Sequence, residues 1–278
     1  MTKELINASS IQLWDTAPTE YVTTDSPTLN EALGGGMRTS NLIVLQAPTG
    51  EGKTTFLMRL AIRSIMSKKR VLYVSVGEQT PEEIYMRLKC MIAGVTYNGN
   101  SREDYSEEDA DRIEETASSG FFDNLYVQYT DDSISKESLE RAVHEFNIKY
   151  IFIDYIGSSL AERADQQYSY LTKLSSELKN YADENHICII TAMQTNRALL
   201  AELKSDNLDV TTIDETFMAD SVGPARKATV CLSLFTYRGQ KYITLFKNRL
   251  KGSKVAIPIQ IKPQTYQWVE LFNRKEGF

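Results

Sequence analysis

The chain alternates short apolar runs with longer stretches in which apolar residues recur at helical spacing. The apolar runs are rich in Ile, Val, Leu and Tyr, and they occupy residues 42–47, 71–76, 125–129, 150–155 and 187–194. Strands that are buried on both faces of a parallel sheet have this composition. The intervening stretches predict helices at 54–67, 81–93, 106–118, 135–146 and 166–184. This alternation predicts an α/β fold with a mostly parallel, twisted sheet flanked by helices.

The pattern changes toward the C-terminus. Residues 229–236 and 242–246 are apolar runs on either side of a turn at Arg238 and Gly239, which predicts a β-hairpin. Two further strand-like runs follow, at 256–261 and 266–271. The sheet is therefore expected to gain antiparallel strands at its C-terminal end.

Residues 21–278 are expected to form one domain, preceded by an N-terminal arm or linker at 1–20. The arm contains Ile11, Leu13 and Trp14 but lacks the periodicity of a core element. A length of 278 residues with 42% hydrophobic residues supports one large core and excludes a disordered chain. The net charge of −6 excludes a uniformly positive surface, so a nucleic acid would have to meet a local patch or a lined channel.

The sequence offers no sign of export or of a membrane anchor. It has no run of 18 apolar residues and no N-terminal apolar segment with a cleavage site, so we expect a cytoplasmic protein (in the host cytoplasm, if phage-encoded) without a membrane partner. Cys90, Cys188 and Cys231 lie in apolar runs and are expected to be reduced core thiols. Neither histidine has a cysteine or a second histidine at ligand spacing, which argues against a zinc site.

The strongest chemical signal is the segment APTGEGKT at 47–54. It fits the phosphate-binding loop G-x-x-x-x-G-K-[ST], with Ala47 in place of the first glycine, and it lies between a predicted strand and a predicted helix. Gly50 and Gly52 let backbone N–H groups turn toward phosphate oxygens, and the helix that follows adds its positive end. Lys53 is expected to contact the β- and γ-phosphates, and the Thr54 hydroxyl to ligate Mg²⁺. The predicted nucleotide-binding residues are Pro48, Thr49, Gly50, Glu51, Gly52, Lys53, Thr54 and Thr55.

Two carboxylates follow other predicted strands. Asp154 ends the run YIFIDY, where a buried carboxylate is costly unless it meets a cation or water; it is expected to complete the Mg²⁺ shell, or else to cap the next turn. Glu78 precedes the segment TPEE, which reads as a helix capping box and explains the glutamates within it. Because Glu78 lies outside that box, it is a candidate general base for the attacking water, the alternative being a solvated loop residue.

A third polar side chain, Gln194, closes the run ICIITAMQ and precedes Thr195, Asn196 and Arg197. Its amide is a candidate sensor of the γ-phosphate, although a polar strand end is the simpler interpretation. The carboxyl ends of parallel strands open onto one edge of a sheet. The phosphate loop, Asp154, Glu78 and Gln194 are therefore expected to converge there.

The most basic part of the chain comes late, at Lys247, Arg249, Lys251 and Lys254. Alternation along a strand places Lys247 and Arg249 on one face. One interpretation is an arginine finger that enters the ATP site of a neighbouring subunit. The other is an edge strand protected by charge. Tyr237 and Arg238, at the hairpin turn, are weak candidates for stacking on the base.

These segments together resemble a known family. LNEALGGGM, AxxxxGKTT, Glu78, IFIDY, Gln194 with Asn196 and Arg197, MADSVGPARKATVCLSL and the late K-N-R occur in this order over about residues 26–262. The chain resembles the RecA-like motor domain of the hexameric replicative DNA helicases, the DnaB family, and the likeness is closer to phage members.

The resemblance implies a RecA-like P-loop NTPase core whose subunits form a ring, commonly of six, with ATP and Mg²⁺ held between neighbours. Lys53, Thr54 and Asp154 would bind phosphate and metal, Glu78 would activate water, and Gln194 would couple nucleotide state to DNA. Arg249, with Lys247, would reach the adjacent γ-phosphate. The loops at 157–168 and 198–220 would face single-stranded DNA. The implied function is an ATP-dependent replicative DNA helicase, with primase or loader proteins as partners.

Two features depart from the family pattern. Few residues precede the motor region, so primase activity is not expected. Residues 198–220 contain six acidic residues against Lys204 alone, a net charge of −5, whereas single-strand binders usually present a positive channel. The alternative is therefore a RecA-like, DNA-dependent ATPase that acts in recombination or as a regulatory or recruiting module without strand separation.

Overall fold

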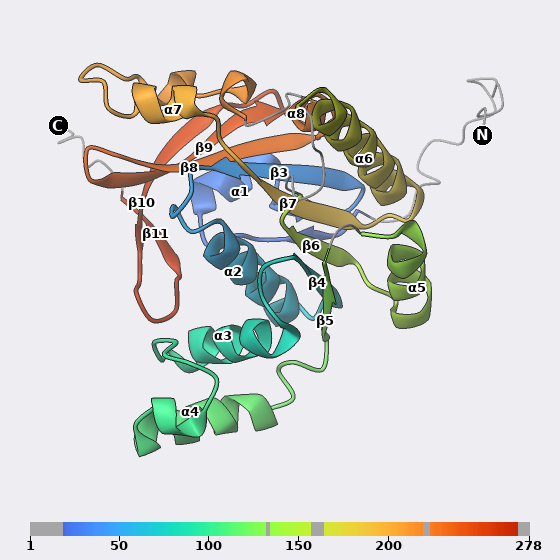
Figure 1. Ribbon diagram of the computed structural model, residues 1–278, viewed down its shortest axis with the longest axis vertical. Coiled ribbons are helices and arrows are strands. Elements are labelled where there is room, and N and C mark those ends of the chain that lie inside the picture. The colour runs from blue at the N-terminus through green and yellow to red at the C-terminus, as the bar shows by residue number, and fades with distance from the viewer. Residues whose placement is uncertain (1–18, 132–133, 157–163, 219–222, 272–278) are drawn as a thin grey trace.

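A computed structural model describes residues 19–131, 134–156, 164–218 and 223–271 (Figure 1). Its centre is a nine-stranded sheet in the order β11-β10-β9-β8-β3-β7-β6-β4-β5. The strands are β3 (Asn41–Ala47), β4 (Val71–Val76), β5 (Leu125–Thr130), β6 (Tyr150–Asp154), β7 (Cys188–Gln194), β8 (Val230–Tyr237), β9 (Gln240–Asn248), β10 (Val255–Ile261) and β11 (Trp268–Glu270).

The sheet has a parallel and an antiparallel part. Every pairing from β8 through β3, β7, β6 and β4 to β5 is parallel, whereas β8–β9, β9–β10 and β10–β11 are antiparallel. The predicted strands, the hairpin and the late antiparallel strands are thus confirmed. The N-terminal arm proposed for 1–20 lies almost entirely outside the described residues.

Helices cover both faces of the sheet (Figure 1). They are α1 (Pro27–Leu33), α2 (Lys53–Met66), α3 (Pro81–Ala93), α4 (Glu107–Ser118), α5 (Lys136–Phe146), α6 (Ala164–Glu184), α7 (Arg197–Glu202) and α8 (Gly223–Lys227). Alternate residues of β3 serve two cores: Ile43 and Leu45 pack with α1, α2 and α3, and Leu42 and Val44 pack with α5, α6 and α8. This double burial explains why the strand runs are apolar at successive positions.

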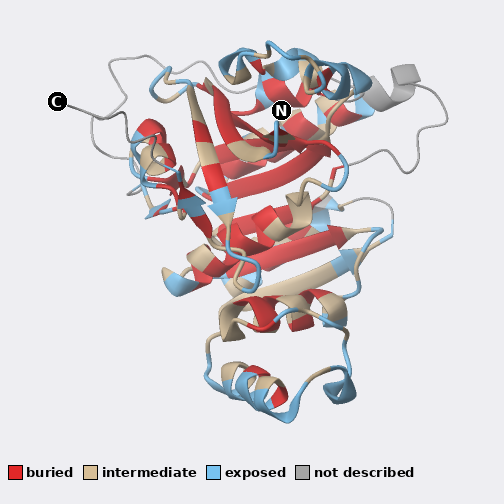
Figure 2. Cartoon of the chain, turned by 90° about the vertical axis from the view of Figure 1, so that its left-hand side faces the viewer, coloured by how far each residue is buried: buried red, intermediate tan, exposed pale blue. Residues whose placement is uncertain are grey.

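The helices α3 and α4 form a lobe at one end of the molecule. Figure 2 shows that the outer side of α4 is largely exposed, while buried positions of α3 face the sheet. Met86, Cys90, Val95 and Ile113 form a small separate core between the two helices. No helix in the described ranges has both the length and the apolar character needed to cross a bilayer.

The region predicted as a loop at 198–220 is instead folded against the sheet, as far as it is described. It contains α7 and two 3-10 turns, at Val210–Thr212 and Glu215–Phe217. Leu199 and Ile213 are buried and pack on Phe235 of β8. The apolar residues are irregularly spaced, so no helical period marked them. The other predicted DNA-facing loop, 157–168, lies mostly outside the described residues.

Sequence analysis also missed α1 and the two-stranded sheet of β1 (Tyr21–Val22) and β2 (Met37–Arg38). The helix α1 has seven residues, too few for a periodic signal. Its start and stop signals are nevertheless in the sequence: Ser26 caps the N-terminus, a proline follows, and Gly34 ends the helix with φ of 78°.

Candidate nucleotide-binding site

The phosphate loop connects the buried end of β3 to the first turn of α2. Gly50 and Gly52 have φ of 82° and 91°, in the left-handed region. A Cβ at either position would meet no atom within 4 Å, so backbone direction, and not crowding, requires glycine there. Ala47 is the last strand residue and pairs in register with Gln194. An ordinary strand residue suffices at that position, which explains why the first glycine of the motif is dispensable.

The N-terminus of α2 is open for an anion. Gly52 caps the helix without any side-chain hydrogen bond, and the first turn contains no acidic residue. The first N–H groups of a helix lack intrahelical acceptors, and the helix dipole favours negative charge beside them. The residues predicted to bind nucleotide form this loop and turn: Pro48, Thr49, Gly50, Glu51, Gly52, Lys53, Thr54 and Thr55.

The Lys53 ammonium lies over its own loop. Its Nζ donates to the carbonyl oxygens of Pro48 at 3.2 Å and Ala47 at 3.4 Å. Burial lowers the pKa of Lys53, and the negative charges of Asp154, Glu78 and Glu51 oppose that shift. The structure thus brings the loop lysine into the field of three carboxylates, two of which come from other strands.

Asp154 ends β6 and is 3% exposed. Its Oδ2 accepts a hydrogen bond from the Tyr73 hydroxyl at 2.9 Å, whereas its buried Oδ1 has no hydrogen-bond partner among the residues that the structure describes. Burial raises the pKa of Asp154, and the Thr54 and Tyr73 hydroxyls and the Lys53 charge oppose that rise. A buried, unpartnered carboxylate oxygen beside a threonine hydroxyl suits a hard cation with oxygen ligands. Thr54 and Asp154 therefore fit the predicted Mg²⁺ pair.

Glu78 lies just past β4, outside the helix cap that follows. The predicted capping box is confirmed: Thr80 Oγ1 accepts from Glu83 N at 3.3 Å, and Thr80 N donates to the Glu83 carboxylate at 3.1 Å. Glu78 is exposed, yet partial burial and the Asp154 charge raise its pKa, against the opposing charge of Lys53. A carboxylate with a raised pKa beside the phosphate loop has the properties of a general base.

Gln194 lies directly beside the start of the phosphate loop. It is the register partner of Ala47, and the following Thr195 N donates to Ala47 O at 3.2 Å. The Gln194 Nε2 donates to the Tyr155 hydroxyl at 3.4 Å. Two residues on, Asn196 Nδ2 donates to the carbonyl oxygen of Thr216 at 2.7 Å. The amide therefore lies between the loop and the folded region predicted to face DNA.

Lys247 and Arg249 lie at the opposite end of the sheet, where the parallel strands begin. The strand β9 runs antiparallel to β8, so its first residues lie near the phosphate loop: Lys241 Nζ donates to Glu51 O at 2.9 Å and pairs with the Glu51 carboxylate at 2.5 Å. The six residue steps from Lys241 to Lys247 span about 20 Å at strand spacing. There, Lys247 and Arg249 donate to the last carbonyl groups of α8, those of Ala225 and Arg226 respectively. The strand-end residues are gathered as predicted, and these two cations are not.

Two polar residues beside the site were not found from the sequence. Tyr73, on β4, bonds to Asp154, and burial raises the pKa of both residues while the positive charge of Arg87, on α3, opposes that rise. Arg87 had a usable signal, because it shares a helix face with the buried Ile84, Leu88 and Met91. Tyr73 had none, because a tyrosine is ordinary in a buried strand.

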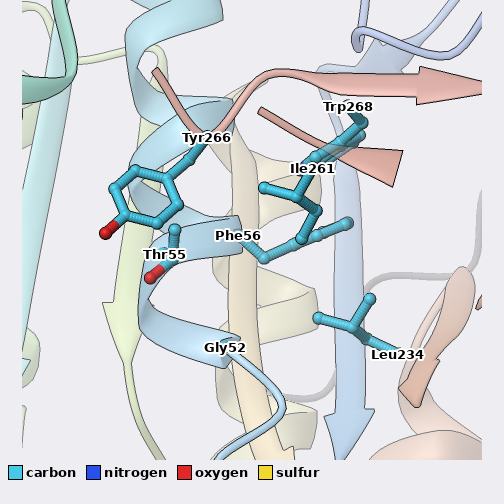
Figure 3. Close-up of a pocket in the computed structure, with 7 residues that line it drawn as sticks. All are labelled: Gly52, Thr55, Phe56, Leu234, Ile261, Tyr266 and Trp268. Atoms are coloured by element: carbon cyan, nitrogen blue, oxygen red, sulfur yellow. The ribbon is translucent and has the colours of Figure 1, made fainter. Parts of the chain in front are cut away.

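A hollow of about 120 Å³ opens beside the first turn of α2. Figure 3 shows Tyr266 and Thr55 on one side of it and Trp268, Ile261 and Leu234 on the other. It is lined by Gly52, Thr55, Phe56, Leu234, Ile261, Tyr266 and Trp268. The Phe56 and Trp268 rings stack at 4.0 Å between centroids. An apolar, aromatic hollow next to a phosphate loop suits a flat heterocyclic base.

Tyr237 and Arg238, the sequence candidates for stacking on the base, do not line this hollow. The Tyr237 side chain is buried, and its hydroxyl accepts from Leu208 N at 3.2 Å and donates to Ser205 O at 3.1 Å. Arg238 pairs with the exposed Asp206 at 3.1 Å. Both residues instead hold the segment after α7 against the hairpin. Of the aromatic residues that line the hollow, Phe56 and Trp268 are buried and Tyr266 is partly exposed.

Comparison with solved structures agrees with this geometry. The chain superposes on a solved ATPase domain with a TM-score of 0.72 and 16% identity, covering 91% of this chain and 93% of that one. A DnaB-like replicative helicase, described with its interactions with primase, gives a TM-score of 0.71 and 16% identity, covering 91% of this chain and 62% of that one. These likenesses show that the chain shares the fold of these two proteins.

Comparison of sequences identifies the family. The chain is 25% identical to the replicative DNA helicase DnaB of Helicobacter pylori over 232 residues, which is 81% of this chain and 44% of that protein. It therefore spans less than half the length of that relative. It is also 37% identical to the DNA repair protein RadA of Aquifex aeolicus, over 27% of this chain and 17% of that protein. The family model described as "DnaB-like helicase C terminal domain" matches residues 22–208, more than half of the chain. The chain belongs to the DnaB-like helicase C-terminal domain family.

Proposed function

We propose that this chain is the motor domain of an ATP-dependent replicative DNA helicase. Copies of it assemble into a six-membered ring and hydrolyse ATP at the interfaces between neighbours. Hydrolysis drives movement along single-stranded DNA and separation of the duplex. The relatives that match over most of the chain carry the name replicative DNA helicase.

One observation supports the proposal: the two groups of candidate site residues lie at opposite ends of the parallel strands of one sheet. The carboxyl edge holds the phosphate loop, Asp154, Glu78 and Gln194. The other edge holds Lys247 and Arg249, about 20 Å away along β9. A cation that stabilises the charge of phosphoryl transfer must touch the transferred group. Arg249 can do so only in the site of an adjacent copy, which requires an assembly.

Each residue then has a role that follows from its position. The backbone N–H groups of 48–55 and the Lys53 ammonium hold the phosphates. The Glu78 carboxylate accepts the proton of the attacking water, and Arg249, helped by Lys247, stabilises the charge that develops on the neighbour's γ-phosphate. Thr54 and Asp154 would hold Mg²⁺, which when bound neutralises phosphate charge. The base would lie in the hollow beside Tyr266.

Coupling to DNA follows the chain from Gln194. Its neighbour Thr195 is bonded to the phosphate loop, and Asn196 is bonded to the segment at 216–218. A change at the γ-phosphate therefore has a short covalent and hydrogen-bonded route to the region between β7 and β8. Because that region is acidic, backbone N–H groups, and not a basic patch, would grip the DNA phosphates.

The runner-up, a recombination or regulatory ATPase without strand separation, is less favoured. The RadA relatives match over only 34% and 27% of the chain, against 81% for a DnaB relative. One solved relative is described with its interactions with primase. A primase or a loader protein is accordingly part of the proposal as a partner of the assembled ring.

The test combines imaging with activity. Electron microscopy with a non-hydrolysable ATP analogue and oligo-dT is expected to show six-membered rings with DNA in the central channel. ATP hydrolysis is expected to rise on addition of single-stranded DNA, and a forked duplex to be opened. A DNA-independent ATPase rate together with intact forks would rule out the helicase and leave the runner-up.

A further inference from the structure

The hydrogen bond between Tyr73 and Asp154 joins a second strand to the metal site. Tyr73 lies on β4 directly opposite Phe152 of β6, and Asp154 is two residues beyond Phe152. Residues two apart on a strand share a face, so Tyr73 and Asp154 are on the same face of the sheet. The Tyr73 ring lies roughly parallel to that of Phe152, with 6.5 Å between centroids and 16° between planes. The hydroxyl reaches along the strand to Asp154 Oδ2 at 2.9 Å.

Neither partner of this bond has freedom to move. Tyr73 has no exposed surface, and Asp154 is 3% exposed. A buried phenol must find an acceptor, and a buried carboxylate oxygen must find a donor, so each satisfies the other. The bond engages only one carboxylate oxygen. The other, Oδ1, is buried and has no hydrogen-bond partner within the described part of the chain, on a residue whose pKa also responds to Thr54 and Lys53.

We propose that Tyr73 is a positioning residue for the metal: it holds Asp154 Oδ2 so that Oδ1 is left as the oxygen available to Mg²⁺ and its water shell. This inference rests on the proposed ATP–Mg²⁺ site. Groups that bond to a metal-binding side chain and fix its orientation contribute about 10- to 100-fold in metal affinity or activity. Tyr73 acts through Asp154 and does not touch the nucleotide.

The test compares two tyrosines. Tyr73→Phe removes the hydroxyl and leaves the ring in place. Tyr150→Phe is the matched control, because Tyr150 is equally buried, lies on the adjacent β6, and donates a hydrogen bond of 3.0 Å to the carbonyl of Met37, far from the phosphate loop. Both variants lose one buried hydroxyl bond, so both are expected to lose thermal stability, Tyr73→Phe the more because its acceptor is a carboxylate.

The readout is the gain in affinity for a fluorescent, non-hydrolysable ATP analogue that Mg²⁺ gives over EDTA. For Tyr73→Phe we expect this gain to fall at least tenfold, with unchanged affinity in EDTA. For Tyr150→Phe we expect both affinities to match those of the unsubstituted protein. Titration with Mn²⁺ in place of Mg²⁺, followed by electron paramagnetic resonance, is expected to show the same loss for Tyr73→Phe alone.

The remaining outcomes are separable. An unchanged Mg²⁺ gain in Tyr73→Phe overturns the inference and leaves the proposed function standing. Loss of affinity in EDTA as well as in Mg²⁺ shows that Tyr73 only supports the fold, which also overturns it. If the unsubstituted protein fails to bind the analogue at all, the proposed function itself fails.

Discussion

The two ends of the parallel strands in the central sheet carry different chemistry, and they are called here the carboxyl edge and the amino edge. At the carboxyl edge, four parallel strands deliver a phosphate loop, two carboxylates and an amide, and their charges shift one another's pKa values. At the amino edge, Lys247 and Arg249 stand without a carboxylate bonded to them in the described part of the chain and are held by backbone carbonyl groups of α8. The first group of residues is a candidate ATP site to which Lys247 and Arg249 of the same chain do not reach. The second group is a pair of cations that lies far from that site.

This difference has a simple geometric origin. Parallel strands place all their carboxyl ends together, so residues far apart in sequence meet without special arrangement. The strand β9 runs the other way, with Lys241 bonded to Glu51 of the phosphate loop at its start and Lys247 near its end. One strand thus connects the site of its own chain to the cations proposed for the next. In the proposed ring, each ATP site therefore combines the phosphate loop of one chain with Lys247 and Arg249 of its neighbour.

The largest effect is expected from Arg249→Ala. Loss of an arginine finger costs about 10³- to 10⁵-fold in turnover, so ATP hydrolysis by the assembled protein should fall by at least 10³-fold. Mixing Arg249→Ala with Glu78→Gln subunits should restore part of the activity, because some interfaces then combine an intact Glu78 with an intact Arg249. Steady-state ATPase assays of the mixture measure this. No recovery on mixing would mean that both residues act within one chain.

Glu78→Gln alone is expected to lower turnover by about 10²- to 10⁴-fold while nucleotide binding persists, since only the base is removed. Single-turnover hydrolysis and analogue binding separate the two properties. The control is Glu82→Gln, a first-turn residue of α3 outside the site, which should hydrolyse ATP at nearly the normal rate. Near-normal turnover in Glu78→Gln would move the base to another residue.

Asp154→Asn is expected to stabilise the nucleotide-free protein while it abolishes hydrolysis. Burial raises the folded-state pKa of Asp154, so the folded protein binds more protons than the unfolded chain between about pH 4, the unfolded pKa, and the raised folded-state pKa. Stability is therefore lost as pH rises through that window, and the neutral amide avoids the loss. Melting curves at pH 8 should show a higher Tm for Asp154→Asn, and the difference should shrink below about pH 4.

The exposed Asp209 provides the opposite sign for comparison. Hydrogen bonds from Thr211 lower its pKa, so Asp209→Asn should not raise Tm at pH 8. Equal behaviour of the two variants would show that burial of the Asp154 charge costs the protein nothing.

The smallest effect concerns the link between β9 and the phosphate loop. Lys241→Met breaks the partly buried pair with Glu51 and leaves that carboxylate, within the described ranges, with the Thr236 hydroxyl at 2.8 Å as its hydrogen-bond partner. We expect the free energy of unfolding in urea to fall by about 1–2 kcal/mol. Lys251→Met, at the other edge, removes an exposed lysine with one contact at 3.5 Å and should change stability by less than about 0.5 kcal/mol. If Lys241→Met and Lys251→Met lower the free energy of unfolding equally, the Lys241–Glu51 pair does not stabilise the fold more than an ordinary surface lysine does.

Much of this arrangement was accessible from the sequence because it follows from local pattern. Apolar runs such as 150–155 and 187–194 marked strands whose two faces are both buried, and the punctuation at Thr80 and Pro81 marked the start of α3 within one residue. The gathering of Lys53, Asp154, Glu78 and Gln194 followed from parallel strand geometry alone. Their assigned chemical roles remain predictions.

Other features were hidden because they depend on which surfaces meet. The region 198–220 looked like a loop, but Leu199 and Ile213 find a core that only the β8–β9 hairpin supplies. Tyr237 looked available for a base, yet its hydroxyl is occupied by the segment after α7. The base-sized hollow needs Tyr266 and Trp268, which are more than 200 residues from Gly52 in sequence.

Local sequence patterns were enough to predict the strands, the phosphate loop and the end of the sheet at which its partners gather, because periodicity and strand direction are local properties. Three features follow only from the folded arrangement: β9 carries its cations away from the chain's own site, Tyr73 engages a single oxygen of Asp154, and the hollow beside α2 is aromatic. Those facts depend on strand order and side-chain packing between distant segments, and no local pattern encodes them.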